Sequence, residues 1–418
     1  MTDDNAPRPP DAARSADHLR GLTRLAVDAT TGLAHVVEEM HGALSIVPTW
    51  LGSGLVYATI RGLTRVVGAG LDRALALAPQ LAAGGESRPE REHLLAALNG
   101  VFGDHLAASG NPLAIEPRLR RHGRPLELTV QALAMTFSGA RDAALANTPA
   151  PSGDLLVLVH GSSMSDVGWL RQGHDHGAAL ERDLGSAVMH FHYNSGLHVS
   201  TSGSALSDLL EQLVQAWPVP VTSLTLVTHS MGGLVARSAC HLGAASSWLP
   251  HLRALVFLGT PHHGAPLERG GNWLEEMLGL TPWTRPLTRL ARIRSAGVTD
   301  LRYGSILDGD WHRKDRFQRT RDPRPPTPLP THVACYAVAA AIRSARGTTR
   351  ATDGLVPIES ALGHHRRRPE MDLAIPPAHQ HIAYGTHHLD LLSSAEVYDV
   401  MRTWLGNHAR GVAAPIAR

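Results

Sequence analysis

Short apolar runs separated by helix-compatible stretches are the main pattern in the second half of the chain. Runs of this length, rich in Val, Leu and Ala, are typical of buried strands. Their alternation with helical segments predicts a parallel sheet covered by helices on both faces, and therefore an α/β fold. The expected strands lie near residues 154–159, 187–192, 223–227, 254–258, 332–341 and 380–384.

The first part of the chain has a different period. Apolar residues recur at three- and four-residue steps between Leu19 and Leu44 and again between Leu94 and Leu106, which predicts amphipathic helices. We interpret residues 1–109 as a helical N-terminal region. It is either a cap docked on the rest of the protein or a set of helices for a membrane surface or a partner.

Residues 110–410 are expected to form one domain. Its opening segment, 112–128, alternates apolar and polar residues around the turn-like 121–124, which predicts a hairpin at the edge of the sheet. A Pro/Gly/Ser-rich linker, 147–153, then precedes the first parallel strand.

Between residues 264 and 330 the alternation of strands and helices stops. A plain connection of this length is uncommon, so we predict an inserted helical subdomain. Trp273 and Met277 belong to its apolar face, and the proline-rich 321–330 is a stiff return to the next strand. Both a fixed cap and a moving lid are consistent with this pattern.

Ser230 stands at a junction between an apolar, strand-like run and the helix-compatible stretch that begins at Leu234. This context predicts a sharp strand-to-helix turn that projects Oγ into a cleft. Gly232 leaves the turn free of a clashing Cβ, whereas Thr228 replaces the first glycine of the usual Gly-x-Ser-x-Gly pattern. An ordinary strand-turn-helix junction is the alternative interpretation.

Four further segments accompany Ser230. Upstream, a strand-like run ends in His160-Gly161-Ser162, and downstream another run is closed by the segment 259–264. Asp353 follows in an Asp-Gly turn, and His388 precedes Leu389-Asp390-Leu391-Leu392. The chain order of these side chains is Ser, Asp, His, the order found in α/β-hydrolases.

With these five segments, which span roughly residues 150–405, the chain resembles the lipase and esterase branch of the α/β-hydrolase superfamily. Within it, the chain is similar to bacterial proteins that resemble GPI-inositol deacylases and triacylglycerol lipases. The resemblance implies an α/β-hydrolase fold with a nucleophile, Ser230, a base, His388, and an acid, Asp353. It also implies an oxyanion hole formed by the backbone N–H groups of Met231 and Ser162.

Competing residues stand near two of these positions. Glu359 and Asp372 are rival acids, and His387 adjoins the base. The resemblance selects His388, because the family places its base immediately before a Leu-x-Leu-Leu run. In the same family the insertion forms a lid over an acyl-binding cleft, and we therefore expect Trp273 and Met277 to contact substrate.

Composition excludes several classes of protein. With 418 residues and a formal net charge of +2, the chain has no nucleic-acid footprint. Its many histidines include close pairs, yet no carboxylate or cysteine cluster completes a zinc set, so neither a metal nor another cofactor is expected. Two cysteines, Cys240 and Cys335, fit reduced core positions.

The N-terminus is polar and lacks an apolar signal-peptide core, so we expect a cytoplasmic protein. The uncharged segment 42–60 is near the length of a membrane span, but Pro48 and several glycines favour a buried helix pair or peripheral membrane contact.

The leading hypothesis is a serine hydrolase that cleaves carboxylic esters of lipids or small molecules through an acyl-enzyme. A thioesterase, amidase or acyltransferase would use the same side chains, and a non-catalytic, membrane-associated adaptor with a hydrolase-like scaffold is a separate alternative.

Overall fold

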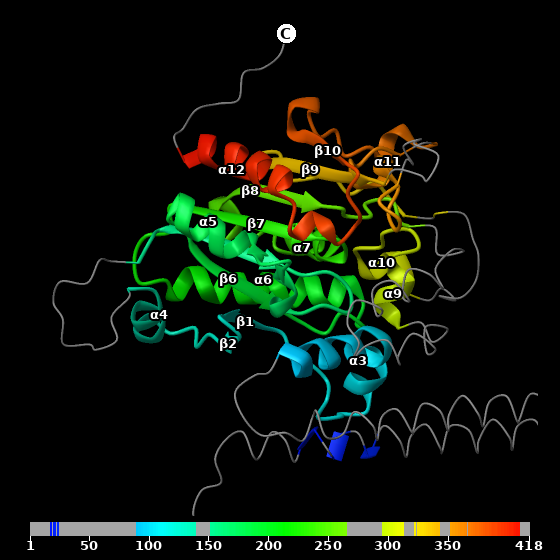
Figure 1. The fold of residues 1–418 in the computed structure, drawn as a ribbon. Coiled ribbons are helices and arrows are strands. Elements are labelled where there is room, and N and C mark those ends of the chain that lie inside the picture. Colours follow the sequence, from blue (N-terminus) through cyan, green and yellow to red (C-terminus); the bar gives the residue numbers. More distant parts are fainter. Residues whose placement is uncertain are drawn as a thin grey trace, which may run out of the picture.

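The computed structural model describes residues 89–138, 151–265, 295–312, 324–342, 352–365 and 367–409, with Asp322 and a few residues between positions 17 and 24. An eight-stranded sheet in the order β10-β9-β8-β7-β3-β6-β1-β2 forms its centre (Figure 1). The strands are β1 (Arg118–Arg121), β2 (Arg124–Pro125), β3 (Asp154–Val159), β6 (Ala187–His192), β7 (Ser223–His229), β8 (Leu252–Leu258), β9 (Ala334–Ala341) and β10 (Gln380–Tyr384).

The strands from β10 to β6 pair in parallel, whereas β1 is antiparallel to both β6 and β2. These are the strands that the apolar runs predicted, and the expected edge hairpin is present at β1 and β2. His122 and Gly123 join the two strands with φ of 48° and 75°. Positive φ at both central residues defines the turn that best matches the twist of a two-residue hairpin.

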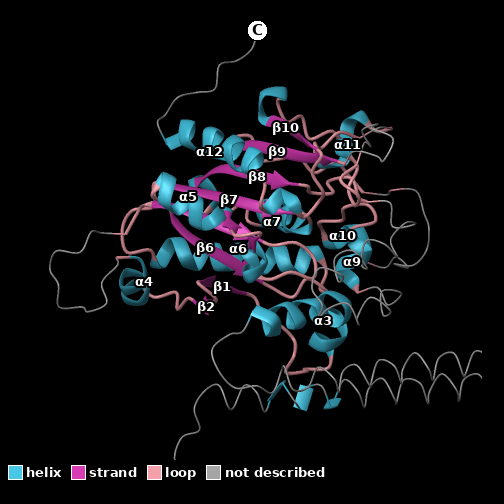
Figure 2. Cartoon of the chain, viewed as in Figure 1, coloured by secondary structure: helices cyan, strands magenta, loops and turns pink. Residues whose placement is uncertain are grey.

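Helices cover both faces of the sheet (Figure 2). The chain leaves β3 through α5 (His176–Leu184) to reach β6 on one side, and returns through α6 (Val199–Ala216) to β7 on the other side of β3. Because crossovers between parallel strands are right-handed, this reversal places α5 and α6 on opposite faces. The helix α7 (Met231–Leu242) packs beside α6, and α12 (Ala395–Ala409) packs beside α5.

The strand order therefore reverses between β3 and β7, because β6 lies on one side of β3 and β7 on the other. In open α/β sheets, ligands bind at such a switch point. The register pairs Val159 with Thr228, so the residues that follow both strands emerge side by side. This mostly parallel, doubly covered sheet is an α/β-hydrolase fold, as the sequence predicted.

Local sequence signals set the ends of several elements. The side chain of Asp175 accepts a hydrogen bond from the Ala178 N–H (3.0 Å) and so caps the start of α5, while Gly185 ends that helix in the left-handed conformation. Thr129 caps α4 (Val130–Phe137) in the same way as Asp175. The remaining described elements are short: β4 (Leu170–Arg171), β5 (His174–Asp175), α9 (Ala296–Asp300), α10 (Asp308–Trp311) and α11 (Ile358–Ala361), with the 3₁₀ turns η1 (Asp166–Trp169), η2 (Leu249–His251), η5 (Pro369–Met371), η6 (Pro377–His379) and η7 (Asp390–Leu392).

The helix α3 (Pro89–Ala108) corresponds to the helix predicted between Leu94 and Leu106. Its leucines are buried in the same hydrophobic core as the strands of the sheet. The described part of the N-terminal region is therefore packed into the hydrolase core. The other predicted helix, between Leu19 and Leu44, and the segment 42–60 lie mostly or wholly outside the described residues.

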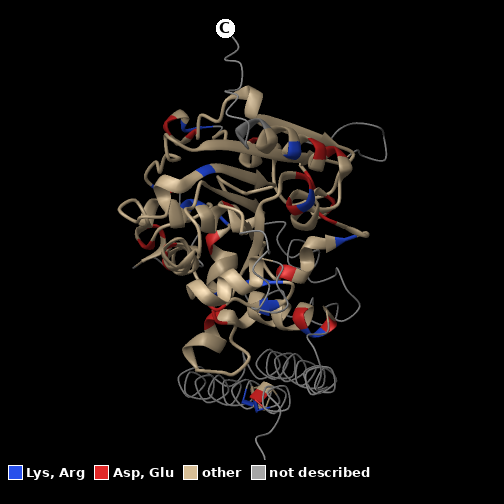
Figure 3. Cartoon of the chain, turned by 90° about the vertical axis from the view of Figure 1, so that its left-hand side faces the viewer, with Lys and Arg blue, Asp and Glu red and all other residues tan. Residues whose placement is uncertain are grey.

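Positively and negatively charged residues are interspersed along the described elements (Figure 3). The arginines of β1 all meet carboxylates: Arg118 pairs with Glu116, Arg120 with Glu92 and Asp166, and Arg121 with Glu181. Cys240 and Cys335 are both buried and unbridged. Within the described ranges, no helix is long and apolar enough to cross a membrane.

Candidate active site

Ser230 lies on a sharp turn between β7 and α7. Its φ is 53° and its ψ is −123°, a combination that a residue with a side chain adopts only when its surroundings enforce it. The Ser230 N–H donates to the Leu258 carbonyl at the end of β8 (2.8 Å), which fixes the turn against the neighbouring strand. The sharp strand-to-helix turn that the sequence predicted is therefore present, and its backbone is strained at Ser230.

Glycines allow the first turn of α7 to approach the ends of two strands. A Cβ at Gly232 would lie 2.4 Å from the Val159 carbonyl oxygen, and one at Gly233 would lie 2.0 Å from Thr260 Oγ1. Both distances are far below van der Waals contact, so no side chain fits at either position. Gly161 similarly faces Ser230, because its Cβ would lie 3.0 Å from the Ser230 Cβ.

A buried histidine–carboxylate pair lies beside this turn. His388 Nδ1 donates to Asp353 Oδ2 at 2.6 Å, and both side chains are at most 2% exposed. The second Asp353 oxygen, Oδ1, accepts the backbone N–H groups of Leu355 (2.8 Å) and Val356 (2.7 Å). When the ring carries its proton on Nδ1, the lone pair of Nε2 points away from Asp353 and can accept a proton.

The Ser230 Oγ and the His388 Nε2 are both buried, and neither has a hydrogen-bond partner among the described residues. The His388 ring lies against Gly259, which follows the Leu258 that binds the Ser230 N–H: a Cβ at Gly259 would be 3.0 Å from His388 Nδ1. A buried serine hydroxyl and a nearby histidine nitrogen can act as a nucleophile and its general base. His387, in contrast, is exposed.

The loop that carries His388 is held from several sides. His229, the last residue of β7, donates from Nε2 to the His388 carbonyl (3.2 Å). His176 donates from Nε2 to the Leu391 carbonyl (2.8 Å), and Arg171 pairs with Asp390 (3.0 Å). The bond from His229 to the His388 backbone joins residues far apart in the chain, so it could be seen only in the tertiary structure.

Two backbone N–H groups, those of Met231 and Ser162, lie beside the Ser230 turn. Met231 is the first residue of α7, where helical N–H groups have no partner within the helix and the helix dipole favours negative charge. Ser162 follows β3, beside the Ser230 turn. Within the described part of the chain, neither of these N–H groups donates a hydrogen bond.

The direction of the Ser162 N–H is set by neighbouring side chains. His160 Nδ1 donates to the Gly161 carbonyl (2.8 Å), which belongs to the same peptide unit as the Ser162 N–H. Next along the chain, the Ser163 N–H donates to Ser195 Oγ (2.9 Å). The sequence identified His160-Gly161 as a loop motif but could not show what the His160 ring contacts.

The remaining sequence predictions have different outcomes. Asp372, one rival acid, pairs with His364 (2.9 Å) and not with His388. Glu359, the other, lies in α11. Trp273 and Met277, together with most of the predicted insertion, lie outside the described residues.

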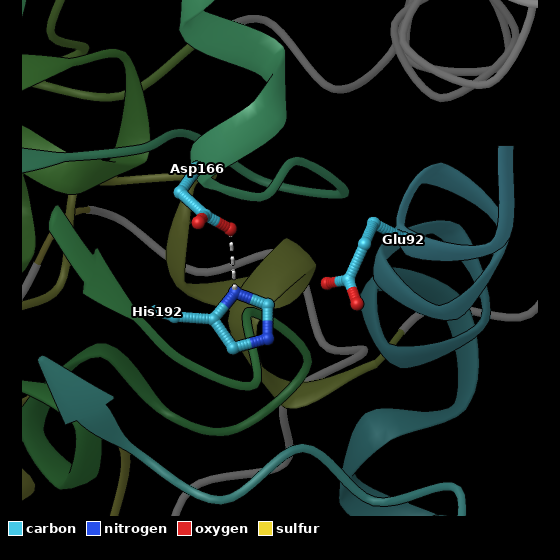
Figure 4. Close-up of side chains that lie close together, drawn as sticks. All are labelled: Glu92, Asp166 and His192. Atoms are coloured by element: carbon cyan, nitrogen blue, oxygen red, sulfur yellow. Dashed lines mark ion pairs between the residues drawn. The ribbon is translucent and has the colours of Figure 1, made fainter. Parts of the chain in front are cut away.

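A cluster of potential metal ligands lies on the α3 side of β6. Oxygen or nitrogen atoms of Glu92, Asp166 and His192 lie within 4.8 Å of one another, and His192 faces Asp166 (Figure 4). However, Arg120 Nη1 binds Glu92 Oε2 (2.8 Å) and Asp166 Oδ1 (2.9 Å). A divalent cation on these oxygens would lie against the guanidinium, so we interpret the cluster as an ion-pair network between elements.

Comparisons with known proteins agree with the fold. The family model of the PGAP1-like alpha/beta domain matches residues 151–326, the segment that contains β3, β7 and Ser230. No curated protein sequence matches the chain.

Among solved structures, the chain is similar to the mature lipase BlEst2 of Bacillus licheniformis, which is 18% identical with a TM-score of 0.41 over 62% of this chain and 94% of that one. Lipase 1 of Pelosinus fermentans is 12% identical with a TM-score of 0.38 over 63% and 100%.

Several buried histidines around these loops predict how stability depends on pH. Burial lowers the pKa of His160 and His176 to about 4 and holds the pKa of His192, His229 and His262 well below the usual value. The rings are neutral in the folded protein but take up protons in the unfolded chain below pH ~6.5. The unfolded state then binds more protons, so stability falls as the pH falls.

We therefore expect the free energy of unfolding to be several kcal/mol lower at pH 5 than at pH 7, because each ring contributes up to about 1.4 kcal/mol per pH unit in this range. Urea denaturation at a series of pH values measures this. The variant His262→Leu lacks one of these rings. The slope of its unfolding free energy against pH should therefore be smaller by the equivalent of about one bound proton. An unchanged slope would contradict the assignment of this ring.

Proposed function

We propose that the protein is a serine hydrolase of carboxylic esters, with Ser230 as nucleophile, His388 as general base and acid, and Asp353 as the orienting carboxylate. The observation that carries the proposal is the buried His388–Asp353 pair beside a strained Ser230 turn, where Ser230 Oγ and His388 Nε2 have no partner in the described part of the chain. An ordinary strand-turn-helix junction requires neither the strain nor the pair.

In this mechanism, Ser230 Oγ attacks the carbonyl carbon of the ester while His388 Nε2 accepts the hydroxyl proton. Asp353 stays ionised and stabilises the imidazolium. The negative charge that develops on the carbonyl oxygen is met by the N–H groups of Met231 and Ser162. His388 then donates its proton to the departing alcohol, and a water molecule, activated by the same ring, hydrolyses the acyl-enzyme to release the carboxylic acid.

The place of these residues in the fold supports the proposal. Ser230 and Ser162 follow neighbouring strands at the switch point of the sheet, where bound ligands are expected. The match to a PGAP1-like alpha/beta domain covers this region. A thioester, an amide or an acyl acceptor other than water would use the same groups, whereas a non-catalytic adaptor would leave Ser230 unreactive.

For the substrate, we propose an ester of a lipid or small molecule whose acyl chain contacts the insertion at 264–330. The apolar Trp273 and Met277 exceed what a surface loop needs. Contact of the N-terminal helices with a membrane surface is a related proposal, as is a cytoplasmic location.

Substitution Ser230→Ala tests the nucleophile. Turnover of a short-chain aryl ester should fall on the order of a thousandfold or more, because the covalent route is lost. Wild-type protein, but not the variant, should react with a fluorophosphonate probe. Near-normal turnover by a folded variant would exclude Ser230, and a wild type inert to the probe would favour the adaptor.

A matched pair of variants tests the base. His388→Ala should slow acylation by several orders of magnitude, since the ring both accepts the serine proton and donates to Asp353. His387→Ala should have a modest effect, because that side chain is exposed. Rapid-mixing measurements of the acylation phase compare them, and the reverse ranking would place the base at His387.

Charged substitutions in the insertion test the acyl pocket. Trp273→Asp or Met277→Asp should reduce kcat/KM for long-chain esters more than for acetate esters, because a carboxylate disfavours burial of an acyl chain. A chain-length series with aryl esters gives the ratio. Equal losses for all chain lengths would point to a folding defect instead of a pocket.

A further inference from the structure

The helix α3 lies directly against the loop that carries the Ser162 N–H. A Cβ at Gly100 would be 1.9 Å from Ser163 Oγ, 2.8 Å from Ser163 Cβ and 2.9 Å from Ser163 Cα. Real Cβ atoms do not approach other atoms this closely. Position 100 therefore admits no side chain unless the loop or the helix moves.

The loop after β6, residues 193–198, completes this contact. Asn194 Nδ2 donates to the Gly103 carbonyl of α3 (2.9 Å), and a Cβ at Gly196 would lie 2.2 Å from the Asn99 carbonyl oxygen. From the same loop, Ser195 Oγ accepts the Ser163 N–H (2.9 Å). Ser163 is thus held between α3 on one side and a loop that α3 itself holds on the other.

A second link joins α3 to the far end of the Ser162 loop. Glu92 in the first turn of α3 binds Arg120 of β1, and the same Arg120 nitrogen binds Asp166, where the loop enters η1. The three groups are mostly buried, so removal of the arginine would leave carboxylates without a partner. This network, shown in part in Figure 4, resists sliding of α3 along the loop.

Displacement of the loop would be felt at the Ser162 N–H. Since Ser163 is the next residue, a shift of its backbone rotates or translates the Gly161–Ser162 peptide. Hydrogen bonds weaken steeply as the donor angle and distance depart from their optimum. A donor that serves a transition state must be placed to within about half an ångström.

We propose that α3 is a positioning element of the oxyanion hole: the bare backbone at Gly100 sets the place of Ser163 and, through it, the direction of the Ser162 N–H. The proposal rests on the function proposed above. No atom of α3 has to touch substrate, so Gly100 is a positioning residue. Part of the N-terminal region is then required for catalysis itself.

The variant Gly100→Ala tests this proposal. We expect kcat to fall about tenfold to a hundredfold with little change in KM, since a misplaced donor weakens binding of the transition state and not of the substrate. A merely structural role would lower the amount of folded enzyme without altering kcat per active site, which titration with the fluorophosphonate probe counts. Gly309→Ala is the matched control, because its added Cβ meets nothing within 4 Å.

A compensating substitution identifies the contact. Ser163→Gly removes two of the three atoms that an alanine at position 100 would meet, and glycine suits the φ of 58° at that position. Within the described residues the Ser163 Oγ has no hydrogen-bond partner, so Ser163→Gly removes no polar contact, and the single variant measures what the Ser163 side chain itself contributes. In the double variant Gly100→Ala/Ser163→Gly, we expect most of the lost kcat to return.

Several results would overturn the proposal: normal kcat in Gly100→Ala, failure of Ser163→Gly to rescue a folded double variant, or a double variant that does not fold. Amide hydrogen exchange in residues 160–165 gives a readout that does not need turnover. Exchange there should rise in Gly100→Ala and return toward the wild-type rate in the double variant. If wild-type Ser230 reacts with neither ester nor probe, the proposed function fails, while the exchange data still decide whether α3 positions the loop.

Discussion

The geometry of the candidate site depends on one close approach, that of the first turn of α7 to the carboxyl end of β3. At Gly232 this contact leaves no room for a Cβ beside the Val159 carbonyl. The approach forces Ser230 into positive φ and brings the N-terminus of α7 beside the Ser162 loop. The strand order and the position of α7 thus both determine the backbone conformation of Ser230. A strained conformation of this kind persists only where the surrounding packing enforces it.

Burial around this turn gives the histidines distinct tasks. His160 and His229 are fully buried, and burial keeps the pKa of each ring low, so each serves as a neutral donor to a backbone carbonyl. His388 differs because Asp353 accepts its Nδ1 proton. Neutral rings can hold loops without adding positive charge beside the group that is to accept a proton. In the proposed chemistry, His388 acts as the base because its partner is a carboxylate, whereas His160 and His229 bind backbone carbonyls.

The helix α3 changes how the N-terminal region is understood. The sequence separated residues 1–109 from the hydrolase domain, and the two stretches do have different hydrophobic periods. In the structure, however, α3 shares the hydrophobic core of the sheet. Gly100 and Gly103 contact the loops that follow β3 and β6, and Glu92 binds Arg120 of β1. The helix α3, which precedes the sheet in sequence, therefore packs against the loop of the candidate oxyanion hole.

The sequence by itself determined the class of fold, because apolar runs and their alternation with helical stretches depend only on local periodicity. It also marked Ser230, Asp353 and His388, since strand-end motifs carry chemistry in a fixed chain order. Their catalytic roles stay predictions. Only the tertiary structure decided that Asp353 and not Asp372 meets His388, and that His160, His229 and Gly100 support the site. These contacts join residues far apart in the chain, and no local pattern encodes a distance between them.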